Sequence, residues 1–397
     1  MSNLLSLRNT QIVLSVTFVS LLGIPIIGPA MPAVQKEFGI ANADIGWMMM
    51  SSFALPALVF VPLTAFLADT FGKKMVIVPS IFVFSIAGTA ISFAPNAETI
   101  VVLRFLQGVG ASCLSTLNVA LVPDLFTGRD RVAVTGYTSA LQNIGAGLLP
   151  LVGGILAGLV WYYPFLSAAL GIPLGFFVWI YLDNNTSKRS AGGSRSYFGH
   201  AWSHIRQREV LELCFMTFGF IFTGFGAFIS YIPTFMNDRF GVPALIIGFV
   251  ISARALSGTI MATFIAKLTD RFTTRQLITC GFLILAVGMT VVPLAWGPFG
   301  ILISGLCYGG AFGIIRPLVQ VHLLNIAPDN LRSTFSSMNG LALRIAHVLA
   351  PAGAGVLLAF YDFDVLYFTA AGLAVFMALF SFSASALKGG KKAGELE

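Results

Sequence analysis

Two ten-residue segments decide the fold that this sequence predicts: residues 65–74, AFLADTFGKK, and residues 266–275, AKLTDRFTTR. Both place an aspartate, a phenylalanine and a final cation at the same offsets, and Asp270 follows Asp69 by 201 residues. Each segment stands between two apolar stretches that are long enough to cross a bilayer. A polar pattern that recurs at the same place in two halves indicates a duplicated unit, which is typical of an alternating-access transporter.

The composition independently predicts a membrane protein. Hydrophobic residues make up 57% of the 397 residues and charged residues only 10%, against roughly 25% charged residues in soluble domains. Twelve apolar spans are expected, near residues 10–32, 42–67, 75–94, 98–122, 132–160, 163–182, 211–232, 243–266, 276–296, 298–325, 333–359 and 364–386. The predicted fold is therefore an all-α integral membrane protein with twelve transmembrane helices in two pseudo-symmetric six-helix bundles.

The charged residues predict the domain boundaries and the orientation. Residues 183–210 are polar, basic and contain Gly and Ser, so we expect a cytoplasmic linker between an N-terminal bundle (1–182) and a C-terminal bundle with its tail (211–397). With both termini cytoplasmic, most of the 23 Lys and Arg fall in cytoplasmic segments. This pattern predicts a multi-pass protein of the inner (cytoplasmic) membrane, whose net charge of +7 faces anionic lipid rather than nucleic acid.

No sequence pattern predicts an enzyme. The chain contains no GxxxxGK[ST] loop for a nucleotide and no nucleophile elbow. Its four cysteines lie in apolar spans without metal-ligand spacing. We therefore expect no cofactor, no metal and no disulfide, and a monomer that is driven by an ion gradient or by substrate exchange.

Three patterns resemble the major facilitator superfamily, in particular its twelve-span drug:proton antiporters. Residues 65–74 are similar to the family's GxLADxxGRK, with Ala65 in place of the first Gly, and residues 103–110, LRFLQGVG, are similar to its RxxQG pattern. Residues 136–154 in the fifth span resemble the antiporter signature except at Leu149, where Gly is usual. The resemblance implies a secondary active transporter that works by alternating access and exports its substrate.

The duplicated segments predict a cytoplasmic gate. A carboxylate at a helix end can cap the following helix or pair with nearby cations, and such a cluster would latch the two halves in the outward-open state. The predicted gating residues are Asp69, Lys73, Lys74, Asp124, Asp270 and Arg275. In the alternative interpretation, Lys73 and Lys74 are ordinary anchors on the cytoplasmic side.

Small residues and one proline predict a hinge in the fifth span. Gly145, Gly153 and Gly154 permit close helix approach, and Pro150 removes one backbone hydrogen bond. We expect this face to pack against the eighth span.

Ionisable residues inside spans are the strongest indication of a substrate site. Arg104, Arg254, Arg316 and Arg344 lie within spans, at a cost of at least about 2.5–3.5 kcal/mol each on insertion scales. All 16 acidic residues fall in loops, at helix ends or in the tail, so no carboxylate is expected near the midplane. Cations without a fixed anion favour an anionic or amphiphilic small molecule as substrate. In the alternative, one or two of these arginines bond to backbone carbonyls or to amides such as that of Gln107.

The seventh span adds an apolar wall and a polar tip to the predicted site. The predicted substrate contacts are Arg254, Arg344, Arg316, Arg104, Tyr231 and Phe222. His347, one turn beyond Arg344, is the only mid-span side chain that titrates near neutral pH in water, so it is the predicted proton carrier, with Arg104 as an alternative relay. The sequence leaves open a broad multidrug:proton antiporter, an organic-anion exchanger or symporter, and a non-transporting receptor or scaffold.

Overall fold

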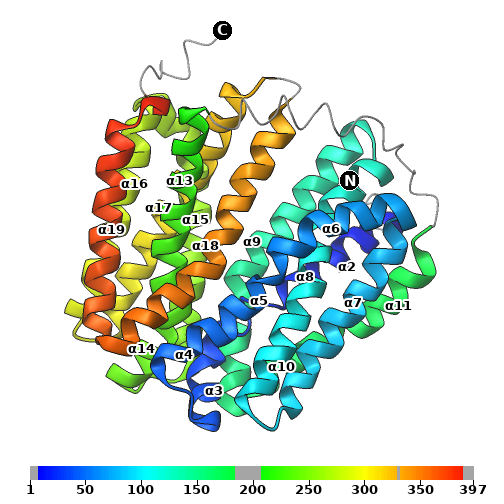
Figure 1. Cartoon of the computed structure of the whole chain (residues 1–397), viewed down its shortest axis with the longest axis horizontal. Helices are drawn as coiled ribbons and strands as arrows, with labels where there is room; N and C mark the ends of the chain where they lie inside the picture. Colours follow the sequence, from blue (N-terminus) through cyan, green and yellow to red (C-terminus); the bar gives the residue numbers. More distant parts are fainter. Residues whose placement is uncertain (1–7, 184–206, 329–330, 388–397) are drawn as a thin grey trace. The chain divides into compact units, whose positions relative to one another are not determined.

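The computed structural model describes residues 8–183, 207–328 and 331–387, and every regular element among them is a helix. Eleven helices of this described part are long and apolar enough to cross a membrane, so the chain is a multi-pass membrane protein. The chain divides into two compact units: unit 1 comprises Met1–Ala191 with Pro243–Phe249, and unit 2 comprises Gly192–Val242 with Val250–Glu397 (Figure 1). Most of the predicted linker and the tail after Leu387 lie outside the described residues.

Unit 1 contains the first six predicted spans. Its elements are α2 (Arg8–Leu21), η1 (Gly28–Ala30), α3 (Met31–Phe38), α4 (Asn42–Gly46), η2 (Trp47–Ser51), α5 (Ser52–Ala54), α6 (Pro56–Phe71), α7 (Lys73–Ala90), η3 (Ile91–Phe93), α8 (Ala97–Leu125), α9 (Gly128–Leu159), α10 (Tyr163–Leu166), η4 (Ser167–Leu170) and α11 (Gly171–Tyr181).

Unit 2 contains the remaining spans, although the first six residues of α15 belong to unit 1. Its elements are α13 (Arg208–Thr223), η5 (Gly224–Ile229), α14 (Ser230–Phe240), α15 (Ala244–Thr269), α16 (Thr274–Leu294), α17 (Pro298–Ile326), α18 (Arg332–Phe360), α19 (Phe363–Ser383) and η7 (Ser385–Leu387).

The first span of each unit leaves regular α-helix within one residue of the same repeat position. In unit 1, α2 ends at Leu21 and irregular turns follow over residues 22–27, where Gly23 and Pro25 disfavour a continuous helix. Because α2 has only 14 residues, this predicted span is not among the eleven long helices. In unit 2 the π-helical segment η5 begins at Gly224, which follows Gly23 by the same 201 residues as the duplicated segments.

One tight helix crossing occurs in both units. A Cβ atom at Gly108 of α8 would clash with the carbonyl oxygen of Phe53, and a Cβ atom at Gly309 of α17 would clash with that of Arg254. Gly309 follows Gly108, and Arg254 follows Phe53, by 201 residues. The two pseudo-symmetric six-helix bundles that the sequence predicts are therefore confirmed at the level of a backbone contact.

The glycines of the fifth span, α9, pack closely within unit 1. A Cβ atom at Gly145 would lie 2.7 Å from the Leu21 side chain, and one at Gly153 would clash with the carbonyl oxygen of Ile26. Gly154 lies against the backbone of Ala244, one of the later residues that belong to unit 1. Gly145 and Gly153 thus meet the first span, and of these three glycines Gly154 meets the eighth span as predicted. The hinge role, with bending at Pro150, stays a prediction.

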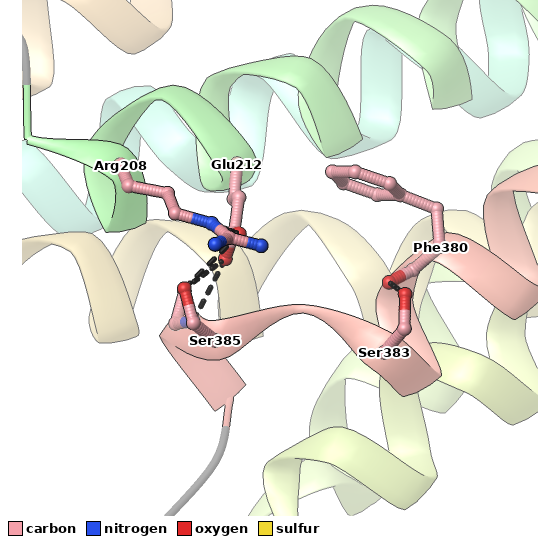
Figure 2. A network of polar contacts seen from close by, with 6 residues as sticks. Arg208, Glu212, Phe380, Ser383 and Ser385 are labelled. Carbon is pink, nitrogen blue, oxygen red and sulfur yellow. Dashed lines mark hydrogen bonds and ion pairs between the residues drawn. The ribbon is translucent and has the colours of Figure 1, made fainter.

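Unit 2 buries one carboxylate near the start of α13. Glu212 is the only acidic side chain that the described residues bury (7% exposed). It accepts hydrogen bonds from Arg208 Nε (2.8 Å), Ser385 Oγ (3.0 Å) and the Ala386 amide (2.8 Å), as Figure 2 shows for the side chains. The Ala386 carbonyl can only accept, so the bond of 2.7 Å to His322 Nε2 has the imidazole as donor. The peptide after α19 is thus fixed to both α13 and α17.

Removing the Glu212 charge should destabilise the protein. In Glu212→Gln the carboxylate bonds to Arg208 and to the Ser385–Ala386 peptide are lost or weakened, so we expect the free energy of unfolding to fall by about 1–3 kcal/mol. Glu209→Gln is the matched control, because Glu209 lies in the same first turns of α13 and is exposed. The measurement is thermal unfolding of the purified protein in detergent. Equal midpoints for wild type and Glu212→Gln would show that the network adds no stability.

Candidate functional site

Three of the four span arginines lie in unit 2, on three different helices. We call them the arginine cluster: Arg254 on α15, Arg316 on α17 and Arg344 on α18. Arg254 Cζ lies 5.1 Å from the ring centroid of Tyr308 and 5.7 Å from that of Phe312. Arg316 Cζ lies 5.4 Å from the same Phe312 ring. One phenylalanine is therefore within cation–π distance of two guanidinium groups.

The sequence of α17 explains this arrangement. Tyr308, Phe312 and Arg316 recur every four residues and so share one face of the helix. Beside that face, Gly309 contacts the Arg254 carbonyl, and a Cβ atom at Gly313 would clash with the carbonyl oxygen of Gly258 on α15. Because the two backbones touch, the Arg254 side chain reaches the aromatic face of α17.

No carboxylate neutralises the arginine cluster within the part of the chain that the structure describes. The ion pairs of the described residues join Arg8 to Asp183, Lys73 to Asp124, Arg208 to Glu212, and Arg239 to Asp364, and none of them includes an arginine of the cluster. Arg254 Nε is buried and has no hydrogen-bond partner among these residues. Within the same described part, neither Arg316 nor Arg344 forms a hydrogen bond or ion pair.

His347 lies beside the cluster. Its ring centroid is 4.4 Å from that of Phe225, in an edge-on contact. The charges of Arg316 and Arg344 both act on the imidazole. The structure therefore brings the predicted proton carrier into electrostatic range of two predicted substrate contacts, and the carrier role itself stays a prediction.

Arg104 in unit 1 differs from the arginine cluster, because backbone carbonyls accept hydrogen bonds from its guanidinium group. Its side chain is fully buried, with Nε and Nη2 donating to the Met49 carbonyl (2.9 and 2.7 Å) and Nη1 donating to the Gly23 carbonyl (3.0 Å) and to Gln107 Oε1 (2.8 Å). The Phe53 ring centroid lies 4.4 Å from Cζ. These contacts support the alternative in which this arginine holds carbonyls, since it presents no surface to a substrate in this conformation.

The duplication makes the two arginine environments directly comparable. At the repeat distance of 201 residues, Arg254 corresponds to Phe53 and Tyr308 corresponds to Gln107. In unit 1 the cation at this crossing is Arg104 of α8, which lies against Phe53 and has carbonyl partners. In unit 2 the cation is on the other helix of the pair and lies against Tyr308, with a buried Nε that lacks a partner among the described residues. The same backbone crossing thus carries an arginine with several carbonyl partners in unit 1. In unit 2 it carries an arginine that interacts with the Tyr308 side chain while its buried Nε has no partner among the described residues.

The two predicted substrate contacts of the seventh span, Tyr231 and Phe222, have other neighbours. Tyr231 is fully buried and its hydroxyl donates to the Pro351 carbonyl (3.1 Å), which ties α14 to α18. Phe222 stacks on Phe218 at 5.4 Å between ring centroids and lines an apolar cavity of about 90 Å³ with residues of η5, α18 and α19. The substrate contacts of Tyr231 and Phe222 stay predictions.

The gating residues of unit 1 form a smaller cluster than the sequence predicts. Lys73 pairs with Asp124 and donates to the Ala120 carbonyl at 2.7 Å, so it joins α7 to the end of α8. Asp69 is exposed, and neither it nor Lys74 forms an ion pair with a described residue. The expected pairing of Asp69 with a nearby cation is therefore not found among the described residues, because Lys73 pairs with Asp124 instead.

In unit 2, Asp270 and Arg275 correspond to Asp69 and Lys74, and they form no ion pair with each other. Asp270 is exposed and makes no ion pair with a described residue. Arg275 instead places Cζ 4.0 Å from the ring centroid of Phe382 on α19. The gating role of both residues stays a prediction.

Sequence reasoning did not single out Tyr308 and Phe312. Aromatic residues are common in apolar spans, so neither carries a signal alone. The spacing Tyr308, Phe312, Arg316, with glycine at Gly309 and Gly313, could have indicated an aromatic face that ends in a cation.

Comparisons with known proteins agree with this architecture. The sequence model of the Major Facilitator Superfamily matches residues 13–351 and 235–395. The quinolone resistance protein NorA of Staphylococcus aureus (strain N315) is 26% identical over 349 residues, which cover 84% of this chain and 89% of that protein. Multidrug resistance protein 1 of Bacillus subtilis (strain 168) is 26% identical over 379 residues, covering 93% and 94%.

Solved structures show the same fold. The nucleoside transporter NupG superimposes with a TM-score of 0.79 at 16% identity, covering 96% of this chain and 99% of that one. A D-xylose–proton symporter superimposes with a TM-score of 0.77 at 16% identity, covering 96% and 99%.

The contrast between Arg104 and Arg344 predicts different effects on stability. Arg104→Ala leaves the Met49 and Gly23 carbonyls without their donor, and each unsatisfied buried group costs about 1–3 kcal/mol. We expect a clearly lower thermal midpoint for Arg104→Ala in detergent. Arg344→Ala is the control and should unfold at or above the wild-type temperature, since it removes a charge that has no partner among the described residues. Wild-type stability of Arg104→Ala would remove the structural role assigned to this side chain.

Proposed function

The chain belongs to the Major Facilitator Superfamily, and we propose that this secondary active transporter exports a small organic anion or acidic amphiphile that binds at the arginine cluster of unit 2. The observation that carries the proposal is the set of three span arginines without a carboxylate partner in the described part of the chain. A charge inside a span is costly unless it meets a partner or water. An oxyanion on the substrate would supply the missing partner through charge-assisted hydrogen bonds.

Unit 2 alone carries a charge at the three positions of the arginine cluster. At the repeat distance, the three residues of the arginine cluster correspond to the uncharged side chains Phe53, Ser115 and Asn143 of unit 1. The positions themselves therefore do not require a cation for folding. This supports a role for the cations in binding rather than in maintaining the bundle.

The direction of transport is inferred from the relatives. Two of them carry names that describe quinolone resistance and multidrug resistance. A membrane transporter can confer resistance by removing a compound from the cell, so export is the proposed direction. On the charge pattern of the duplicated halves, both termini are proposed to be cytoplasmic, and the protein is proposed to act as a monomer.

A broad multidrug:proton antiporter is the second candidate. The names of the relatives and the stacked Phe218 and Phe222 rings of α13 favour it. A lipophilic cation would, however, meet the arginine cluster with no described carboxylate to balance it. Comparing organic anions with cationic dyes as ligands of the purified protein separates the two candidates, and an anion exchanger or symporter would share the anion preference.

The arginine cluster should determine anion affinity. Removing one partner of a charge-assisted contact costs on the order of 2–5 kcal/mol when the other charge stays buried, which is a loss of at least about 30-fold in affinity. We expect this loss in Arg254→Ala and in Arg344→Ala, measured by titration of each purified protein with organic anions. Their thermal midpoints serve as the folding control. Wild-type affinity in both variants would refute the anion site.

Proton coupling should depend on His347. Protonation of His347 next to Arg316 and Arg344 adds positive charge where an anion is proposed to bind, so proton and anion occupancy are linked. In proteoliposomes, His347→Ala should lose transport driven by a pH gradient while it keeps exchange of substrate against substrate, which is the internal control. Full pH-driven transport by the variant would eliminate His347 as the carrier.

A further inference from the structure

The Phe312 ring is the point at which two cations of unit 2 meet. Its centroid lies 5.7 Å from Arg254 Cζ and 5.4 Å from Arg316 Cζ, so the two guanidinium carbons are at most about 11 Å apart, the sum of these distances. Two like charges at this distance repel each other in a low-dielectric setting. The negative face of an aromatic ring attracts cations, so the ring offsets part of this repulsion when no anion is bound.

Unit 1 offers a natural comparison. At the repeat distance, Phe312 corresponds to Ala111 and Arg316 corresponds to Ser115, so the ring and the second cation are absent together. The arginine of unit 1 is instead held by the carbonyls of Met49 and Gly23. The aromatic ring therefore occurs where two guanidinium groups lack such bonds.

The ring contact does not use up the hydrogen-bonding capacity of the arginines. A guanidinium carries five N–H donors in its plane, and Arg254 Nε is buried without a partner among the described residues. Arg316 forms no hydrogen bond in the described part of the chain. Both groups thus keep planar donors of the kind that carboxylate and phosphate oxygens accept.

We propose that Phe312 is a positioning residue that holds Arg254 and Arg316 so that both donate to one oxyanion of the substrate, whose apolar body lies against the aromatic face of α17. This inference rests on the proposed export of an organic anion and specifies its substrate class as an aromatic or aliphatic acid with a single compact oxyanion. Tyr308, which also contacts Arg254, extends the same face.

The test uses three probes of similar shape and different charge: benzoate, the neutral benzamide, and the cation benzyltrimethylammonium. Each is titrated into the purified full-length protein by calorimetry. Wild type should bind benzoate and neither of the other two. Phe312→Leu should weaken benzoate binding by about tenfold or more, because the ring contacts of both arginines are lost. Phe312→Tyr keeps the ring and should stay within about threefold of wild type.

Phe299→Leu is the matched control, because Phe299 lies on the same helix and is 83% exposed. Its benzoate affinity should equal that of wild type. Phe312→Met keeps the volume without a ring and replaces the leucine variant if that one does not fold. A double-mutant cycle of Phe312→Met with Arg316→Gln separates positioning from general packing: if Phe312 acts through Arg316, the two effects on affinity are not additive.

The outcomes distinguish the inference from the proposal on which it rests. Benzoate binding by wild type that is unchanged in Phe312→Leu or Phe312→Met, or effects that add in the cycle, overturns the positioning role and leaves the anion site in place. A wild type that does not bind benzoate, or that binds benzyltrimethylammonium in its place, overturns both.

Discussion

The structure depends on a backbone contact between two helices that only glycine permits. Gly108 in unit 1 lies against the Phe53 carbonyl of the crossing helix, and Gly309 in unit 2 lies against the Arg254 carbonyl of the crossing helix. Helices in a membrane associate through such close packing rather than through the hydrophobic effect, since lipid is as apolar as a leucine side chain. The crossing fixes which side chains meet beside it, and in both units these are one arginine and one aromatic ring.

The two units use this crossing differently because their surroundings differ. In unit 1 the first span unwinds after Leu21, and the freed Gly23 carbonyl accepts from Arg104. In unit 2 the position that corresponds to Arg104 is Gly305, where a Cβ atom would lie 3.2 Å from the Phe228 ring. An arginine at Gly305 would meet that ring, and the cation of unit 2 instead projects from α15. The two units therefore share one architecture, in which the arginine of unit 1 holds backbone carbonyls and the arginines of unit 2 are proposed to bind the substrate.

Much of this organisation could be predicted from the sequence, because a polar residue inside an apolar span is conspicuous. Arg254, Arg316 and Arg344 were identifiable in that way, and the duplicated segments predicted the repeat. Tyr308 and Phe312 were not, since an aromatic residue in a span gains meaning only from its neighbours on another helix. The burial of Glu212 could not be predicted either, because it depends on Ser385, which follows 173 residues later, after α19, and no local pattern encodes that contact.

A site whose charge resides on arginines imposes a constraint on the transport cycle. Guanidinium groups stay protonated at any physiological pH, so the arginine cluster cannot release an anion by losing its own charge. Release then requires a change of geometry, an exchanging anion, or a neighbouring group that titrates. His347, on which the charges of Arg316 and Arg344 act, is the predicted proton carrier, and its protonation would strengthen anion binding rather than weaken it. Proton and anion would therefore move in the same direction, so export against a gradient is better served by exchange of one anion for another.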